Sequence, residues 1–439
     1  MIEHSNRCNI KILTLYIIFF ISIRMQAQPP NIIYIMTDDM GYADLGCFGG
    51  KKISTPALDK LAAQGIKFMH SYSAAPVCTP TRVAFMTGRY PARTPVGLME
   101  PLTPNKKDST IGLTKDYPSI ATLLKDAGYS TALIGKWHLG FLAENKPYRN
   151  GIEYFFGFIS GAADYISHKG DGRKHDLYEN DKLVYPAGYI TDLFTLKSIE
   201  YIKSPHKKPF FLSLNYTAPH WPWQGPGDLA YEDSVNFRHG GSPEIYTAMM
   251  KSLDDGIGQI MQVLEDEKLS ENTIVIFTND NGGESYSDNG PFAKGKMTLW
   301  EGGIRVPAIV RWPGKIQAGI ATQQNVITMD WTATILAVAS AKPNPEFALD
   351  GIDLMPVCTG NQKETERTFY WRTFQRAKQK ALRQGNWKYL QVENEEYLFD
   401  LMADPGEKNN LKELHSEIFN RLKNEFSKWE QTVLQPIPL

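Results

Sequence analysis

Four apolar runs in the sequence are each followed closely by polar side chains that could do chemistry. The groups that follow them are, in turn, Asp38-Asp39, Lys136-Trp137-His138, His220 and Asp280-Asn281. A single group of this kind is usually a turn, a cap or an ordinary satisfied side chain. In an open α/β sheet, however, the carboxyl ends of parallel strands meet at one edge, where ligands bind. We therefore expect these groups to lie together in one site.

The acidic members of this set predict a site for a hard cation. Asp38, Asp39 and Asp280 offer carboxylate oxygens and Asn281 offers an amide oxygen, which suit Ca²⁺ or Mg²⁺ better than zinc. Three neighbouring carboxylates would also repel one another without a cation. The alternative interpretation is an Asx-turn at each position, with Gly282-Gly283 giving the loop its flexibility.

The run Cys78-Thr79-Pro80-Thr81-Arg82 is typical of the start of a helix, which Gly88 would end. With Thr79 as the cap and Pro80 in the first turn, Cys78 is expected just outside the helix N-terminus. Backbone N–H groups attract anions at that point, and Arg82 adds a planar donor fork that matches an oxyanion. The alternative is a buried cysteine that happens to precede a short helix.

The scaffold that these motifs require is predicted from apolar runs that alternate with helical patterns. Strands are expected at 31–37, 131–134, 210–214, 273–278 and 306–311, and helices at 56–64, 119–127 and 245–267. This alternation predicts a doubly wound α/β fold with a mixed, mostly parallel sheet flanked by helices. Beyond residue 350 we expect a smaller C-terminal α+β domain, with strands at 368–371, 379–383, 387–392 and 396–401 and a helix over 411–432. The predicted domains are therefore 28–350 for catalysis and 351–439 for the C-terminal part.

The N-terminus has the composition of an export signal. Arg7 and Lys11 precede an apolar run over 12–23, and Ala27 could lie just before a cleavage point. The run is shorter than the roughly 20 residues of a membrane span, so we predict a signal peptide over 1–27 and a periplasmic or extracellular protein. An uncleaved anchor is the alternative, and no other contact with a membrane is expected.

Composition excludes two classes of protein. A formal net charge of -1 gives no sign of a nucleic-acid-binding protein. Removal of the signal would leave three cysteines, Cys47, Cys78 and Cys358. An odd count in an exported chain indicates a free, special thiol rather than a disulfide scaffold.

The Cys78–Arg82 motif with the following Thr87-Gly88 resembles the signature of the type I sulfatases of the alkaline phosphatase-like superfamily, in which the cysteine becomes formylglycine. Further matches cover the chain from Asn31 to about Leu411: Thr37-Asp38-Asp39, 135–140, Ala218-Pro219-His220, 278–282, Lys296 within 296–307, and 398–411. One small departure is Lys294-Gly295, where the family usually has two glycines before the lysine.

The resemblance implies a sulfuric ester hydrolase. Its nucleophile would be the hydrate of formylglycine, made from Cys78 by a sulfatase-maturating enzyme, and its cofactor would be Ca²⁺. The implied metal ligands are Asp38, Asp39, residue 78, Asp280 and Asn281, and the implied catalytic residues are Cys78, Arg82, Lys136, His138, His220 and Lys296. We expect His138 to manage the proton of the geminal diol and His220 to protonate the leaving alcohol, although these two roles could be exchanged.

Residues 161–168 resemble the arylsulfatase B-like branch of the family, which acts on 4-sulfated N-acetylgalactosamine or related galactose sulfates. The substrate is therefore expected to be a sulfated saccharide. Candidate substrate-binding residues are Asp164, His168, Trp221 and Trp223, since aromatic faces stack on sugar rings. Ordinary packing beneath a loop is the alternative for the two tryptophans.

Two other functions are compatible with these motifs. A phosphodiesterase or phosphonate hydrolase of the same fold would share the anion site, and paired sulfate and phosphate esters would tell the two apart. An inactive sulfated-glycan-binding relative would lack a metal ligand or the nucleophile. In this sequence, no core residue of the pattern is missing.

Overall fold

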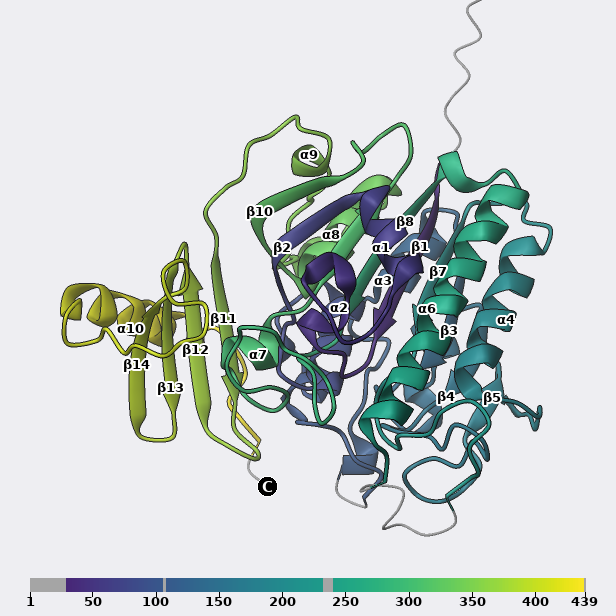
Figure 1. The fold of residues 1–439 in the computed structure, drawn as a ribbon, viewed down its shortest axis with the longest axis horizontal. Coiled ribbons are helices and arrows are strands. Elements are labelled where there is room, and N and C mark those ends of the chain that lie inside the picture. Colours follow the sequence, from purple (N-terminus) through teal and green to yellow (C-terminus); the bar gives the residue numbers. More distant parts are fainter. Residues whose placement is uncertain (1–28, 106–107, 232–239, 438–439) are drawn as a thin grey trace, which may run out of the picture.

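The computed structural model describes residues 29–105, 108–231 and 240–437 (Figure 1). The predicted signal segment, 1–27, lies outside these described residues. Within them, no helix is both long and apolar enough to cross a membrane.

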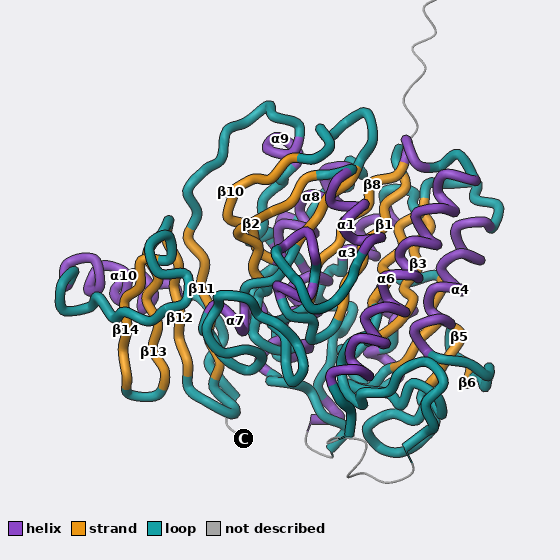
Figure 2. The backbone as a smooth tube through the Cα atoms, in the orientation of Figure 1, coloured by secondary structure: helices purple, strands orange, loops and turns teal. Residues whose placement is uncertain are grey.

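A large mixed sheet forms the centre of the molecule (Figures 1 and 2). Its strands, in spatial order, are β10 (Ile320–Ile327), β2 (Ile66–Tyr72), β9 (Ala308–Arg311), β8 (Thr273–Asn279), β1 (Asn31–Thr37), β7 (Phe210–Asn215), β3 (Ser130–Lys136), β4 (Tyr154–Phe158), β5 (Leu177–Glu179) and β6 (Lys182–Leu183). The run from β8 to β4 is parallel, and β10 is parallel to β2. The remaining pairs are antiparallel. The predicted doubly wound, mostly parallel sheet is confirmed.

Helices cover both faces of this sheet. One face carries α1 (Pro56–Ala63), α4 (Ile190–Lys203) and α6 (Pro243–Asp266), and the other carries α2 (Cys78–Thr87), α3 (Ile120–Asp126) and α8 (Thr328–Val338). Along β1, Ile33 and Ile35 pack with the first group, whereas Tyr34 packs with the second and stacks on Phe85 of α2 at 3.8 Å. Because β1 is apolar on both faces, its sequence is an unbroken apolar run, as buried parallel strands usually are.

A second, antiparallel sheet follows the first and extends to one side of it (Figure 2). It consists of β11 (Thr368–Thr373), β12 (Gln379–Gln384), β13 (Trp387–Val392) and β14 (Glu395–Asp400), with α10 (Ser416–Glu430) packed on it. The predicted helix over 411–432 therefore begins later than expected. The predicted boundary at residue 350 stays a prediction, since Leu354 and Cys358, beyond it, still pack with the α2–α8 core of the first sheet.

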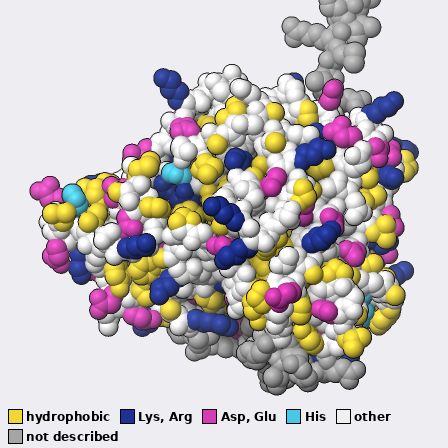
Figure 3. Space-filling view, in the orientation of Figure 1, with side chains coloured by type: hydrophobic (Ala, Val, Ile, Leu, Met, Phe, Trp, Pro, Cys, Tyr) yellow, Lys and Arg dark blue, Asp and Glu magenta, His cyan; other side chains and the backbone are white. Residues whose placement is uncertain are grey.

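A shared core joins the two parts. Trp371 and Leu382 of the second sheet pack in one cluster with Tyr72 at the end of β2 and with Ile304 of the short helix α7 (Glu301–Ile304). Another short helix, α9 (Met355–Cys358), lies in the connection that leads to β11. On the face drawn in Figure 3, acidic and basic side chains are interspersed rather than gathered by sign. This face therefore carries no large patch of one charge, and we expect concentrated charge among the buried residues.

Candidate active site

The ends of four parallel strands bring the predicted polar groups together. β1 pairs with β7 and β8 in a register that sets Met36 opposite Asn215 and Thr37 opposite Asn279. The segments that follow β1 and β8 remain hydrogen-bonded just beyond the sheet, where the amide of Asp280 donates to the carbonyl of Thr37 at 3.1 Å. The expected convergence at one sheet edge is therefore present.

Three cations pair with three buried carboxylates at this edge; Arg82 and Lys136 are buried, and Lys296 is 10% exposed. Lys136 Nζ lies 2.5 Å from Asp38 Oδ2, and Lys296 Nζ lies 2.6 Å from Asp39 Oδ2. Arg82 NH2 lies 2.9 Å from the remaining carboxylate, Asp280 Oδ2. Arg82 NH2 also lies 3.3 Å from Asp38 Oδ2, so the pairs form one network, and removing any one of these groups would weaken the compensation of a buried charge.

Despite these pairs, two oxygens in the cluster lack hydrogen-bond partners among the described residues. Asp38 Oδ1 and Asn281 Oδ1 are buried, and no described residue forms a hydrogen bond with either of them. Burial raises the pKa of Asp280 well above its usual value, and the neighbouring charge of Asp38 raises it further. A divalent cation would coordinate the free oxygens and relieve this repulsion, so the residues fit the expected Ca²⁺.

The geometry adds His220 to the candidate metal ligands. Asp38, Asp39 and His220 each offer a ligand atom, and these atoms lie within 4.8 Å of one another. The sequence predicted His220 only as a proton donor, because a histidine after a strand carries no signal that separates the two roles. The ring contacts Asp39 directly, with Nε2 at 3.5 Å from Oδ2.

The structure corrects the predicted position of Cys78. Helix α2 begins at Cys78 itself, after Val77 as the N-cap residue, so Cys78 does not lie outside the helix. Thr79 is not the cap, because its hydroxyl accepts from the amide of Leu102 at 3.1 Å. The predicted end at Gly88 is confirmed, with the left-handed φ of 66° that favours glycine. Burial raises the pKa of the Cys78 thiol, so the unmodified side chain is neutral and a weak nucleophile.

Both predicted histidines are buried and neutral. Burial lowers the pKa of His138 and of His220 to about 3. His138 Nε2 lies 2.7 Å from the carbonyl of Leu102, so Nε2 carries the hydrogen and Nδ1, which no described residue contacts through a hydrogen bond, can accept a proton. In His220 the nitrogen that meets a carbonyl is Nδ1, at 2.5 Å from Trp221 O, which leaves Nε2 on the side of Asp39.

A cavity of about 490 Å³ opens over this cluster. It is lined by the predicted residues Cys78, His138, His220, Lys296, Trp221 and Trp223. Sequence reasoning missed three of its charged residues, Asp171, Glu284 and Arg376. All three lie in loops outside the recognised motifs. In the sequence, the only hint is that Glu284 directly follows Gly282-Gly283.

Two predicted substrate-binding residues do not line this cavity. Asp164 is fully buried, and its carboxylate accepts from the amides of Ser167 at 2.7 Å and Tyr231 at 2.8 Å. His168 is also buried, with Nε2 at 2.9 Å from the carbonyl of Gly188. Their polar atoms bond within and next to their own loop, so neither residue lines this cavity, and their role in substrate binding stays a prediction.

Two family models match the chain. The sulfatase model matches residues 30–341, and the model of the N-sulphoglucosamine sulphohydrolase C-terminal region matches residues 289–432. The first match covers the large sheet with its strand-end cluster, and the second extends across the antiparallel sheet.

Curated relatives agree with these models. N-acetylgalactosamine-6-sulfatase of Mus musculus is 34% identical over 370 residues, which are 79% of this chain and 69% of that protein. Steryl-sulfatase of Homo sapiens is 31% identical, covering 78% of this chain and 72% of that protein.

Solved structures share the whole fold. Ps i-CgsB has a TM-score of 0.84 at 32% identity, covering 93% of this chain and 94% of that chain. The same protein has been crystallised in complex with k-i-k-neocarrahexaose, and that structure has a TM-score of 0.83. The phosphonate monoester hydrolase of Agrobacterium radiobacter, at 18% identity and a TM-score of 0.69, shares the fold alone.

Proposed function

The chain belongs to the sulfatase family, and we propose that it removes sulfate from galactose- or N-acetylgalactosamine-containing saccharides. The observation that carries this proposal is the group of Arg82, Lys136 and Lys296 at one sheet edge, beside Cys78. Two kinds of relatives support the saccharide: N-acetylgalactosamine-6-sulfatases at 33–34% identity, and a structural neighbour that binds a neocarrahexaose. The narrower assignment to the arylsulfatase B-like branch stays a prediction.

Charge neutralisation is the main task that this site would perform. A sulfate monoester carries a negative charge, and more charge builds up on the leaving oxygen in the transition state. Arg82, Lys136 and Lys296 are held in place by buried carboxylates before substrate arrives. Such preorganised groups stabilise developing charge without reorganising. Their burial strengthens the effect, because few water molecules screen them.

The proposed cofactors act on the same atoms. Asp38, Asp39, Asp280 and Asn281 would hold Ca²⁺, with residue 78 and His220 beside them. The bound ion would draw charge from a sulfate oxygen and acidify a neighbouring hydroxyl. Formylglycine at residue 78 would offer two hydroxyl groups on one carbon when hydrated, one to attack sulfur and the other to expel sulfate.

The two histidines would divide the proton transfers. His138 is the better candidate for taking a proton from residue 78, because its Nδ1 has a free lone pair and the carbonyl of Leu102 fixes its ring. His220 would give a proton to the leaving alcohol only after Nε2 has taken one up, because its Nδ1–H is held by the Trp221 carbonyl, and in that role Nε2 would not bind the metal. The neighbouring Trp221, whose ring centroid lies 4.6 Å from that of His220, would support the sugar.

Two further proposals concern the export and the maturation of the protein. The N-terminal segment would direct export to the periplasm or outside the cell, and a maturating enzyme would convert Cys78 to formylglycine. The first is supported by the basic residues and apolar run of the N-terminal segment, and the second by the resemblance of the Cys78–Arg82 motif to that of the type I sulfatases.

A substrate screen combined with mass spectrometry tests the proposed function. Sulfated galactose and N-acetylgalactosamine esters would be assayed beside matched phosphate esters and a phosphonate ester, and the tryptic peptide with residue 78 would be weighed. We expect sulfate release in proportion to the fraction of peptide that carries the aldehyde. Full activity in molecules with an intact thiol, or a preference for the phosphorus esters, would contradict the proposal.

The role of His220 has a separate test. A sugar alkoxide needs a proton to leave, whereas nitrophenolate leaves almost unaided. His220→Ala should therefore slow hydrolysis of the sulfated sugar by about 10²–10⁴-fold and that of nitrophenyl sulfate far less. Arg82→Ala serves as the control, because it should slow both substrates equally. Equal losses with His220→Ala would show that this residue binds sulfate or metal instead.

A further inference from the structure

One charged residue of the active-site cavity comes from the second sheet. Arg376 lies in the connection between β11 and β12, and it lines the same cavity as Cys78, His138 and Lys296. The other charged and aromatic lining residues belong to loops of the first sheet. The antiparallel sheet therefore contributes directly to the site where substrate would bind.

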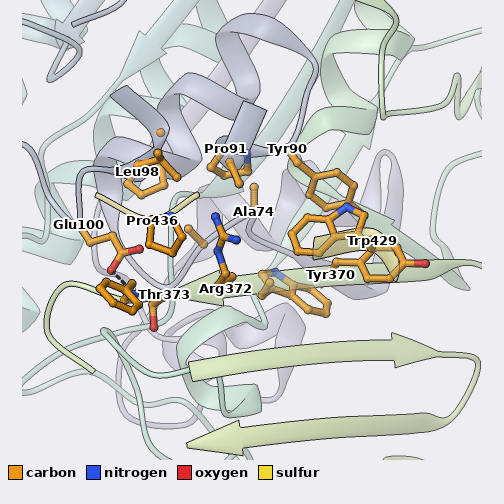
Figure 4. Close-up of a pocket in the computed structure, with 16 residues that line it drawn as sticks. Ala74, Tyr90, Pro91, Leu98, Glu100, Tyr370, Arg372, Thr373, Trp429 and Pro436 are labelled. Atoms are coloured by element: carbon orange, nitrogen blue, oxygen red, sulfur yellow. Dashed lines mark hydrogen bonds between the residues drawn. The ribbon is translucent and has the colours of Figure 1, made fainter. Parts of the chain in front are cut away.

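The connection that carries Arg376 is fixed on one side by Glu100. The Glu100 carboxylate accepts from the amides of Phe374 at 2.8 Å and Gln375 at 2.9 Å, and the Glu100 amide donates to the side chain of Gln375 at 2.8 Å. Figure 4 shows Glu100 reaching toward the end of β11, just beyond Thr373. These bonds hold the two residues that directly precede Arg376.

The other side of the connection is fixed to the loop of the sulfate-site lysine. Gln379, the first residue of β12, accepts from the amide of Leu299 and donates to the carbonyl of Met297, each at 2.9 Å. Met297 follows Lys296 and itself lines the cavity. Arg376 is thus presented by a connection tied at both ends, so binding through it would cost little loss of backbone freedom.

Arg376 also differs from Lys296 in that its charge is not paired with a carboxylate of a described residue. Lys296 Nζ is already paired with Asp39 at 2.6 Å and Glu284 at 3.2 Å. Arg376 is exposed, and across the part of the chain that the structure describes no residue forms an ion pair or hydrogen bond with it. An exposed guanidinium in a substrate cavity, without an acidic partner, is suited to an oxyanion brought by the ligand.

We propose that Arg376 binds a second anionic group of the saccharide, a sulfate or a carboxylate beside the sulfate that is cleaved. This specificity role rests on the proposed function, because it concerns the same substrate in the same cavity. The scissile sulfate would engage the buried cations at the strand ends. The second anion would reach the rim that the antiparallel sheet provides.

Paired substrates test this role. The wild-type protein, Arg376→Gln and Arg376→Lys would be assayed on N-acetylgalactosamine 4-sulfate, its 6-sulfate and its 4,6-disulfate, on the equivalent galactose esters, and on a monosulfated disaccharide with a uronic acid. The matched control is Lys378→Gln, which removes the same charge from the same connection at a residue that does not line the cavity. The measured quantity is the ratio of kcat/KM for a dianionic substrate to that for the better monosulfate.

We expect the wild type to prefer a dianionic substrate and Arg376→Gln to reduce that preference by about 10-fold or more, mainly through KM, as loss of a charge-assisted hydrogen bond would. Arg376→Lys should retain part of it, Lys378→Gln should retain all of it, and added salt should weaken it in the wild type. A preference confined to the disulfates identifies sulfate as the second anion, and one confined to the uronic acid identifies the carboxylate.

Two results would overturn the role of Arg376: an unchanged ratio in Arg376→Gln, or a loss of equal size in Lys378→Gln. Failure of the proposed function would look different, because then the wild type would release sulfate from none of these esters.

Discussion

Two buried clusters of charge, one at the strand ends and one under the antiparallel sheet, use the same residue types in different ways. In the second cluster, Lys388 Nζ lies 2.9 Å from Glu301 and 2.8 Å from Glu407, and Arg305 lies 2.9 Å from Glu301. Tyr72 completes it with a hydroxyl that donates to Glu301 at 2.6 Å. At the strand ends, by contrast, carboxylate and amide oxygens are left without a described partner.

The pKa shifts of the carboxyl groups are mixed within each cluster. Burial alone would raise the pKa of Glu301, but Lys388 and Arg305 outweigh burial and hold it at about 2. At the strand ends, the pKa of Asp280 is raised even though Arg82 is beside it. Each cluster therefore holds one carboxyl with a lowered pKa and one with a raised pKa: Glu301 and Glu407 in one, Asp39 and Asp280 in the other. The strand ends differ in having two buried oxygens, Asp38 Oδ1 and Asn281 Oδ1, with which no described residue forms a hydrogen bond.

The largest expected effect is on activity, and it tests whether Cys78 acts in the reaction or only packs in the core. Cys78→Ala should reduce sulfate ester hydrolysis by a factor on the order of 10⁴ or more, since the nucleophile is lost. The control is Cys358→Ala, which removes an equally buried thiol that does not line the cavity. Each variant should lose a similar, small amount of stability in urea unfolding. Comparable activity losses in both would mean that Cys78 serves packing.

The next effect tests the other cluster. Lys388→Met would leave Glu301 and Glu407 buried with less compensation, and breaking a buried pair costs about 3–5 kcal/mol in free energy of unfolding. Lys380→Met is the matched control, because Lys380 forms a half-exposed pair with Glu430 that is worth about 1 kcal/mol or less. Denaturant unfolding measures both. Folded Lys388→Met should keep wild-type kcat, and a fall in kcat at full folding would show that the two clusters are coupled.

Metal removal should affect only the strand-end cluster. Chelation should reduce activity and lower the melting temperature, because the free oxygens and repelling carboxylates lose their cation. At a Ca²⁺ concentration 100 times the Kd, the ion contributes about 2.7 kcal/mol. Re-addition of Ca²⁺ should restore both properties, and Asp38→Asn should respond much less. An unchanged melting temperature in a demonstrably metal-free sample would argue against the site.

The last prediction concerns the pH dependence of the stability that the second cluster contributes. Burial raises the pKa of Glu407 from 4.5 to about 7. Between these values the folded chain keeps a proton that the unfolded chain has released, so rising pH weakens the folded state. The difference in free energy of unfolding between wild type and Glu407→Gln should therefore fall from about pH 4.5 to pH 7 and then level off. A difference that is constant over this range would contradict the raised pKa.

The sequence predicted the central strands well because they are apolar on both faces. β1 has the predicted bounds, and β3, β7 and β8 differ from theirs by no more than two residues at either end. It did not predict β2 or β10, because polar side chains interrupt them: Gln324 and Asn325 of β10 are buried without making an apolar run. Hydrophobic pattern finds a strand only where burial and apolarity coincide.

The site residues at the strand ends were predicted from the sequence. The charged cavity residues that lie in distant loops were not. One fold rule gathers Asp38, His220 and Asp280, but nothing in the sequence brings Arg376 near residue 78. The same limit applies to Asp164, because sequence does not show whether a loop turns its polar groups inward, as this one does. The link from Lys388 to Glu301 spans 87 residues and belongs to no local pattern.

The burial of helix α2 would limit when the proposed conversion of Cys78 could take place. Cys78 is 2% exposed, and every residue of the helix from Cys78 to Thr87 is buried. An oxidising enzyme would have to bind the peptide segment around Cys78, which is buried in the folded protein. Conversion of residue 78 would therefore precede folding, while the segment is still an accessible chain. Molecules that fold first would be trapped as stable but inert protein, so slower folding would raise the active fraction.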